Sequence, residues 1–96
     1  MRTTYLVTYD ICDSDRLRAV FKLMKGAGDH VQYSVFRCEL SDREREELIS
    51  ALVEVIQPRE DQVLFVDLGP PDGRGADCVL AVGRPYRHPE RLPVIV

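Results

Sequence analysis

Residues 5–11, Tyr5-Leu6-Val7-Thr8-Tyr9-Asp10-Ile11, organise the rest of this 96-residue chain. The stretch is rich in β-branched and aromatic residues and lacks glycine and proline, which predicts a β-strand. Because side chains alternate between the faces of a strand, its odd-numbered residues share one face, and Leu6, Thr8 and Asp10 share the other. A buried, unpaired Asp10 would be costly. We therefore expect water, a metal ion, a basic neighbour or a second subunit to compensate its charge.

The composition is that of a single soluble domain. It is 45% hydrophobic and 30% charged, and its apolar runs are far shorter than the roughly 20 residues that a bilayer span needs. No signal-peptide pattern follows Met1, so we expect a cytoplasmic protein. The three cysteines are odd in number and widely spaced, which argues against a disulfide framework or a thiolate zinc site.

A helix is expected from residue 13 or 14 to about residue 25, since Asp13 and Ser14 are both capping residue types. Its apolar residues follow the i, i+3, i+4, i+7 spacing of one helix face: Leu17, Val20, Phe21 and Met24.

Basic residues gather on the same helix although the formal net charge is −3, because the acidic residues are concentrated in residues 42–72. Arg18, Lys22 and Lys25 form a flank about a quarter turn from the apolar stripe, and Arg16 lies on the first turn near Asp10. Local patches rather than net charge decide binding, so these four bases are candidates for phosphate contacts. The alternative is an ordinary solvated helix face.

The rest of the chain reads as further strands and one more helix. Residues 30–40 are extended, but their hydrophobic phase changes near Ser34-Val35, which predicts two short strands. A capping box of Ser41 and Glu44 begins a second helix, which ends by Pro58. A fourth strand over residues 62–68, a turn-rich loop over 69–75 and a short fifth strand over 78–82 follow.

This βαββαβ order predicts an α+β, ferredoxin-like domain over residues 1–83, followed by a basic, Pro-rich tail over residues 84–96. Two helices would cover one face of an antiparallel sheet and leave the other open, so we expect a second subunit there. Two copies of Asp10 would then approach across a two-fold axis, where a divalent cation could bind.

The chain resembles the CRISPR-associated endoribonuclease family in four features: Tyr9-Asp10-Ile11 ending the first strand, the basic helix, Gly28, and the run Val31-Gln32-Tyr33-Ser34-Val35-Phe36. This family is the smaller of the two core proteins of spacer acquisition and is related to VapD-type interferases. The resemblance covers residues 4–68. The chain departs from the family pattern at Asp29-His30, where arginine is common, and at Arg37, where glutamate is common.

The resemblance implies a homodimer with Mg²⁺-dependent endonuclease activity on single-stranded RNA or duplex DNA. It also implies a heterohexamer-type complex in which one dimer bridges two dimers of the CRISPR integrase subunit and holds the incoming DNA. By position, Asp10 matches the catalytic, metal-linked aspartate, Arg16 and Arg18 match the helix arginines, and Phe36 matches the aromatic residue of the third strand.

Three alternatives stay open. The protein could be a non-catalytic DNA-bridging scaffold for the integrase subunit, a VapD-like RNA-cleaving toxin, or a regulatory module that binds a small ligand. No Gly-rich phosphate loop supports the last. His30 is a candidate general base, although histidine is also common at a strand start. Arg84, Arg87 and Arg91 are candidate contacts for nucleic acid or for a partner.

Overall fold

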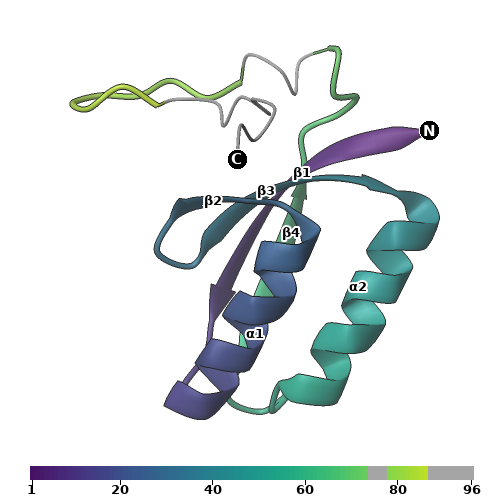
Figure 1. Ribbon diagram of the computed structural model, residues 1–96, viewed down its shortest axis with the longest axis vertical. Helices are drawn as coiled ribbons and strands as arrows, with labels where there is room; N and C mark the ends of the chain where they lie inside the picture. Colours follow the sequence, from purple (N-terminus) through teal and green to yellow (C-terminus); the bar gives the residue numbers. More distant parts are fainter. Residues whose placement is uncertain (74–77, 87–96) are drawn as a thin grey trace, which may run out of the picture.

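The computed structural model describes residues 1–73 and 78–86. These residues form, in chain order, β1 (Arg2–Asp10), α1 (Ser14–Ala27), β2 (Asp29–Gln32), β3 (Val35–Ser41), α2 (Asp42–Val55) and β4 (Gln62–Asp67). Neighbouring strands pair antiparallel in the order β2-β3-β1-β4. Both helices lie on the same side of the sheet (Figure 1). The expected α+β, ferredoxin-like fold is therefore confirmed.

The hydrophobic core lies between the sheet and the helices, as the alternation in β1 predicts. The strand register places Val7 of β1 between Phe36 of β3 and Phe65 of β4. Val7 and Phe36 are fully buried. The other buried apolar residues are Tyr5, Tyr9, Val20, Met24, Cys38, Leu40, Leu48 and Leu52.

Both helices begin at the capping residues that the sequence indicates. Asp13 caps α1, since its carboxylate accepts hydrogen bonds from the backbone N–H groups of Asp15 at 3.1 Å and Arg16 at 2.9 Å. At the start of α2, the Ser41 Oγ accepts from the Glu44 backbone N–H, and the Glu44 Oε1 accepts from the Ser41 backbone N–H. With 14 residues each, α1 and α2 lack the length and apolar character that a bilayer span requires.

The chain leaves α1 in close contact with β3 because Gly28 has no side chain. A Cβ atom at Gly28 would overlap the carbonyl oxygen of Arg37 and the Sγ of Cys38. β2 and β3 then form a hairpin that turns at residues 33–34, where the hydrophobic phase changes. Tyr33, at the tip, has a φ of +29°, which is uncommon for a residue with a side chain.

The face of the sheet away from the helices is open around the second half of β1. The register places Leu6 beside Val66 and Thr8 beside Leu64 on this face. Val66 is 44% exposed and Leu64 is 48% exposed. Asp10 follows on the same face at the end of β1, as the alternation predicts.

The fifth strand expected over residues 78–82 is not formed. These residues have no strand structure, and the side chains of Leu80 and Val82 are 90% and 95% exposed. A strand needs a neighbouring edge for its N–H and C=O groups, and this segment has no paired edge among the described residues. Parts of the predicted loop and tail, including Arg87 and Arg91, lie outside the described residues. The boundary at residue 83 stays a prediction.

Candidate metal and nucleic-acid site

Asp10 is placed where a ligand could reach it. It is exposed, it is the last residue of β1, and it lies opposite Gln62 of β4 in the register. In residues 1–73 and 78–86, no group donates a hydrogen bond to its carboxylate, and no basic side chain pairs with it. The described residues of one chain therefore leave both carboxylate oxygens of Asp10 open to solvent or to a ligand.

One chain offers few further oxygen donors for a metal ion beside Asp10. The described residues contain no group of three or more His, Cys, Asp or Glu side chains that could hold a metal. Mg²⁺ usually keeps several water ligands and takes only one or two carboxylates from a protein. The described part of one chain therefore holds no complete metal site, and Asp10 is an exposed carboxylate that could contribute to a shared one.

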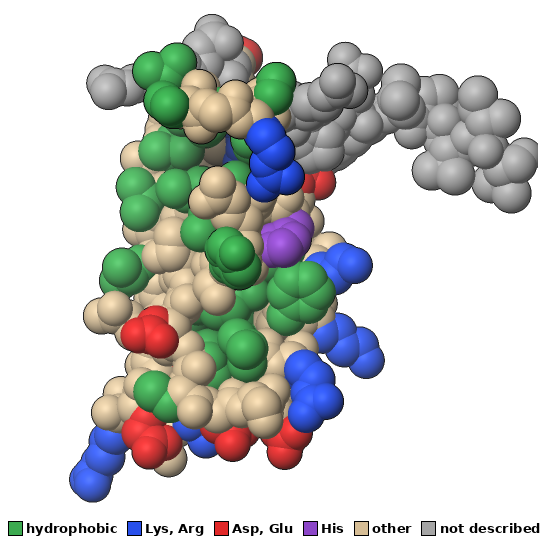
Figure 2. Space-filling view, turned by 90° about the vertical axis from the view of Figure 1, so that its left-hand side faces the viewer, with side chains coloured by type: hydrophobic (Ala, Val, Ile, Leu, Met, Phe, Trp, Pro, Cys, Tyr) green, Lys and Arg blue, Asp and Glu red, His purple; other side chains and the backbone are tan. Residues whose placement is uncertain are grey.

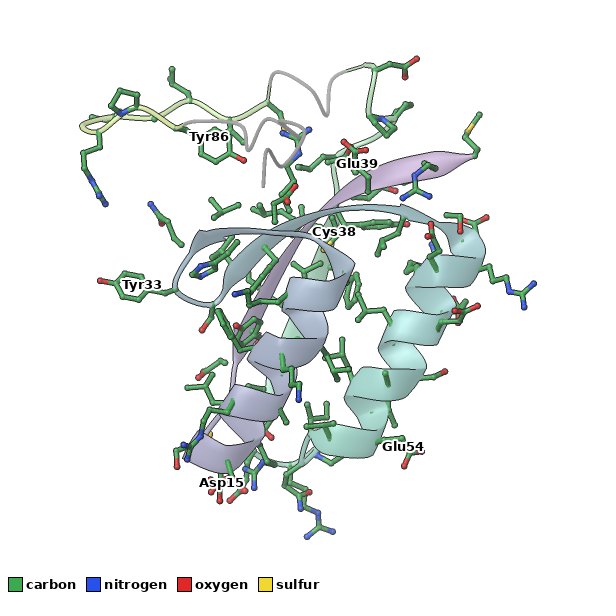
Figure 3. All side chains as sticks on the ribbon, viewed as in Figure 1. Asp15, Tyr33, Cys38, Glu39, Glu54 and Tyr86 are labelled. Atoms are coloured by element: carbon green, nitrogen blue, oxygen red, sulfur yellow. The ribbon has the colours of Figure 1, made fainter. Side chains whose placement is uncertain are left out.

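The two acidic residues that follow Asp10 have other partners. Asp13 caps α1, as described above. The carboxylate of Asp15 lies 2.8 Å from the guanidinium of Arg18, and both side chains are largely exposed. Figure 3 shows Asp15 at the foot of α1. Both carboxylates suit the positive N-terminal end of α1, and their described contacts are with that helix rather than with Asp10.

Arg16, predicted as a phosphate contact, is held by two carboxylates from the loop before β4. Its Nε donates to the Oδ2 of Asp61 at 2.7 Å, and its Nη2 donates to the Oε2 of Glu60 at 3.1 Å. Sequence reasoning missed Asp61. Its position just before a predicted strand is the only signal, and that position does not reveal a partner 45 residues away.

The electrostatics of this ion pair follow from its geometry. The hydrogen bond from Arg16 holds the pKa of Asp61 far below its ordinary range; burial opposes this shift, and the backbone N–H groups of Cys12 and Gln57 add to it. The pKa of Arg16 is raised by the same hydrogen bond. Both groups therefore stay charged at neutral pH.

The remaining predicted bases lie free of the core along α1. The side chain of Arg18 is 76% exposed, and Lys22 and Lys25 are also exposed. The Nζ of Lys25 lies 5.7 Å from the centre of the Phe21 ring, within range of a cation–π contact. Figure 2 shows basic side chains gathered along one edge of this face of the molecule, beside an apolar area. We call Arg18, Lys22 and Lys25 the α1 basic flank.

An aromatic cluster lies between α1 and the β2–β3 hairpin. The His30 ring centre lies 5.2 Å from that of Phe21 and 4.9 Å from that of Phe36. Phe36 is fully buried, so its described contacts are with the core. Tyr33 is 92% exposed, and Figure 3 shows its side chain pointing away from the hairpin. Tyr33 is thus the aromatic side chain here with the freest access to a base.

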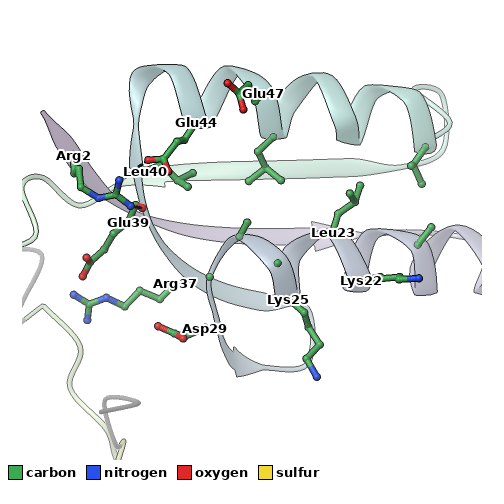
Figure 4. Close-up of a pocket in the computed structure, with 16 residues that line it drawn as sticks. Arg2, Lys22, Leu23, Lys25, Asp29, Arg37, Glu39, Leu40, Glu44 and Glu47 are labelled. Atoms are coloured by element: carbon green, nitrogen blue, oxygen red, sulfur yellow. Dashed lines mark hydrogen bonds and ion pairs between the residues drawn. The ribbon is translucent and has the colours of Figure 1, made fainter. Parts of the chain in front are cut away.

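A groove of about 1040 Å³ lies at the other end of the molecule, between the end of α1, the start of α2 and β3 (Figure 4). It is lined by Arg2, where β1 begins, whereas Asp10 lies where β1 ends, roughly 25 Å away. Lys22 and Lys25 line the groove, but so do Glu39 and Glu47, so its charge is mixed. The groove and the Asp10 site are therefore separate features.

The match to known proteins covers most of the chain. The CRISPR associated protein Cas2 family matches residues 2–72. The chain belongs to the Cas2 family. In Rhodospirillum rubrum, a relative named CRISPR-associated endoribonuclease Cas2 1 is 43% identical over 95 residues, which are 96% of this chain and 89% of that protein. CRISPR-associated endoribonuclease Cas2 of Geobacter sulfurreducens is 36% identical over 96 residues and the whole of both chains.

The fold agrees with this family. The crystal structure of Streptococcus pyogenes Cas2 is similar to this chain with a TM-score of 0.73 and 32% sequence identity, over 83% of this chain and 99% of that one. The resemblance that the motifs indicate is thus confirmed. Asp10, α1 and the β2–β3 hairpin lie within residues 2–72, which the family model matches. Residues 78–86 lie beyond that range, although the Geobacter sulfurreducens relative aligns with the whole chain.

Proposed function

We propose that this Cas2-family protein acts in CRISPR spacer acquisition as a cytoplasmic dimer that binds nucleic acid and cleaves phosphodiester bonds with Mg²⁺. Asp10 is the catalytic carboxylate in this proposal. The observation that carries it is the exposed carboxylate of Asp10 at the end of β1, which no described group binds. The relatives named endoribonucleases favour RNA as the substrate. We take single-stranded RNA, the form that the sequence resemblance implies, with duplex DNA as the alternative.

A second copy of the chain supplies the second carboxylate in this proposal. Leu64 and Val66 leave apolar area exposed on the open face of the sheet, next to Asp10. The segment over residues 79–82 also exposes apolar side chains, those of Val79, Leu80 and Val82. Burying these surfaces against a two-fold related copy is favourable and brings two Asp10 side chains together.

The residues divide the chemistry between them. A Mg²⁺ bound there would lower the pKa of a coordinated water and offset charge on the phosphate. Asp10 would hold the metal, and Tyr9 keeps the end of β1 in place through its backbone N–H, which donates to the Ser34 carbonyl oxygen at 3.0 Å. The α1 basic flank would bind backbone phosphates without regard to sequence.

A non-catalytic scaffold is the second candidate. The observation that favours it is the single carboxylate per chain, since the described residues hold no larger group of metal ligands. In that case the dimer would bridge two dimers of the integrase subunit and hold DNA through the α1 basic flank. A VapD-like toxin would require the same RNA cleavage, but its gene would not lie beside an integrase gene and a repeat array.

Binding and cleavage assays on the purified protein separate these functions. We expect labelled single-stranded RNA to be cut in Mg²⁺ and to stay intact in EDTA, with duplex DNA tested in parallel. Binding without cleavage of either substrate would contradict the catalytic part and support the scaffold.

The contribution of the α1 basic flank is tested separately through the salt dependence of binding. For duplex DNA, Lys22→Ala and Lys25→Ala should each reduce the slope of log K against log salt by about 0.9. Arg43→Ala, on the exposed side of α2, is the matched control and should leave that slope unchanged. If all three variants keep the wild-type slope, Lys22 and Lys25 do not contact the DNA phosphates.

A further inference from the structure

A buried carboxylate joins the loop after β1 to the loop before β4. The side chain of Asp61 has no exposed area. Its Oδ1 accepts a hydrogen bond from the backbone N–H of Cys12 at 2.9 Å, and its Oδ2 accepts from that of Gln57 at 2.8 Å. The Cys12 Sγ also donates to the Glu60 carbonyl oxygen at 2.9 Å. Asp61 therefore fixes the backbone of Cys12, two residues after Asp10.

Arg16 completes this arrangement with a forked contact. Beside the 2.7 Å bond from its Nε to the Asp61 Oδ2, its Nη2 lies 3.3 Å from the Asp61 Oδ1. A guanidinium matches a carboxylate in this way, whereas a lysine ammonium makes only a point contact. The Arg16 side chain is 26% exposed, against 76% for Arg18. Its geometry is that of an internal contact.

We propose that Arg16 and Asp61 are positioning residues, which hold the loop at Cys12 and thereby set the position of Asp10, and that Arg16 does not contact phosphate. The catalytic consequence rests on the proposed function of Asp10. The structural part, which concerns the loop, does not depend on it.

The two possible functions of Arg16 predict opposite results for the same variants. If Arg16 positions the loop, Arg16→Lys loosens the loop and slows cleavage, because lysine cannot make the forked contact with Asp61. Asp61→Asn then has the same effect as Arg16→Lys. If Arg16 binds phosphate, Arg16→Lys retains the charge and most of the binding. Asp61→Asn would then release the guanidinium and strengthen binding.

The binding arm of the test measures the dissociation constant for a labelled duplex DNA over a range of salt concentrations. Wild type, Arg16→Lys, Arg16→Gln, Asp61→Asn and the double variant Arg16→Gln/Asp61→Asn are compared. We expect the slope of log K against log salt concentration to be the same in all five proteins, because none of the substitutions removes a phosphate contact. A slope reduced by about 0.9 in Arg16→Gln would overturn the proposal.

The cleavage arm uses single-turnover rates on the labelled RNA. We expect Arg16→Lys and Asp61→Asn to lower the rate by a similar factor, about tenfold or more. The double variant should be no slower than the slower single variant, because the pair acts as one unit. Independent effects that multiply in the double variant would contradict the proposal. A wild type that cleaves nothing would overturn the proposed function alone, and the other arms would still decide the function of Arg16.

Amide hydrogen exchange provides the readout that needs neither cleavage nor binding. The Cys12 amide should exchange at least about tenfold faster in Arg16→Lys than in wild type, while amides within α2 keep their rates. Equal Cys12 exchange in both proteins would overturn the proposal. Glu60→Gln removes only the outer partner of Arg16, and it should leave the exchange of Cys12 unchanged. If Asp61→Asn fails to fold, Arg16→Lys and this control carry the test.

Discussion

The His30 ring is hydrogen-bonded to the turn of the β2–β3 hairpin, with 2.6 Å between the His30 Nε2 and the Tyr33 carbonyl oxygen. The next residue, Ser34, accepts a hydrogen bond from the backbone N–H of Tyr9 through its own carbonyl oxygen. Tyr9 directly precedes Asp10. The tip of the hairpin therefore supports the end of β1 that carries the candidate carboxylate.

The first prediction concerns the backbone of Tyr33, whose φ of +29° is unfavourable for a residue with a Cβ. Tyr33→Gly and Tyr33→Ala both remove the exposed ring, but only glycine tolerates a positive φ without strain. We expect Tyr33→Gly to be more stable than Tyr33→Ala by about 1 kcal/mol in urea unfolding. Equal stability, or a more stable alanine variant, would show that the tip is not strained.

The second prediction uses two glycines at the end of α1. A Cβ atom at Gly28 would overlap Arg37 and Cys38, whereas at Gly26 it would meet nothing within 4 Å. We expect Gly28→Ala to lower the free energy of unfolding by about 1–3 kcal/mol because the helix end must move away from β3. Gly26→Ala is the control and should raise it by about 0.5–1 kcal/mol, since Gly26 is inside the helix. If both variants behave alike, the close approach of α1 to β3 is not as described.

The third prediction concerns the thiol of Cys38, which is fully buried. Burial raises its pKa to about 12, with a further contribution from the charge of Asp29. Because the thiolate is the reactive form, we expect iodoacetamide at pH 8 to modify the exposed Cys12 while Cys38 stays unmodified in the folded protein. Mass spectrometry of peptides measures this directly. Modification of both residues at one rate would contradict the burial.

The stability of the fold should also depend on Cys38 at high pH. Its pKa is raised on folding, so the unfolded chain loses the proton first as the pH increases. The free energy of unfolding should therefore fall as the pH rises above about 8.5, the ordinary pKa of a thiol. Cys38→Ala should lose this part of the pH dependence, and an unchanged dependence in that variant would assign it to another group.

The fourth prediction is a loss of stability in acid that depends on Asp61. Its pKa is lowered on folding, so the charged form stabilises the fold above the unfolded pKa of about 3.9, and this stabilisation is lost as the pH falls further. We expect the free energy of unfolding, measured in urea at pH 6, to be higher for wild type than for Asp61→Asn. The difference between the two proteins should be smaller at pH 4 and smaller again at pH 3. A difference that does not change with pH would contradict the charged pair.

Local patterns predict most of this fold because they are set by neighbours in the sequence. The alternation in β1 places Val7 in the core and Asp10 on the open face, as found. The capping box of Ser41 and Glu44 requires only residues three apart, and both of its hydrogen bonds are present. The phase change predicted near Ser34-Val35 likewise lies at the observed turn between β2, which ends at Gln32, and β3, which begins at Val35.

Contacts between distant residues could not be predicted in this way. Arg16 has the same spacing on its helix whether it faces a phosphate or Asp61, and only the fold brings Asp61 to it. The segment over residues 78–82 has the composition of a strand, but a strand forms only where it can pair with the edge of another strand. The alternation of the first strand made Asp10 a candidate ligand, and the resemblance added its catalytic role. The fold then gave Asp10 an exposed position with no described partner.

The central claim is that Asp10 is the catalytic carboxylate, and the rate of RNA cleavage by Asp10→Asn measures it most directly. The comparison uses single-turnover rates in Mg²⁺, with Asp72→Asn in an exposed loop as the matched control. The account predicts that Asp10→Asn cleaves at least about a hundredfold more slowly than wild type, with RNA binding retained, and that Asp72→Asn cleaves at the wild-type rate. Equal rates for Asp10→Asn and wild type would contradict it.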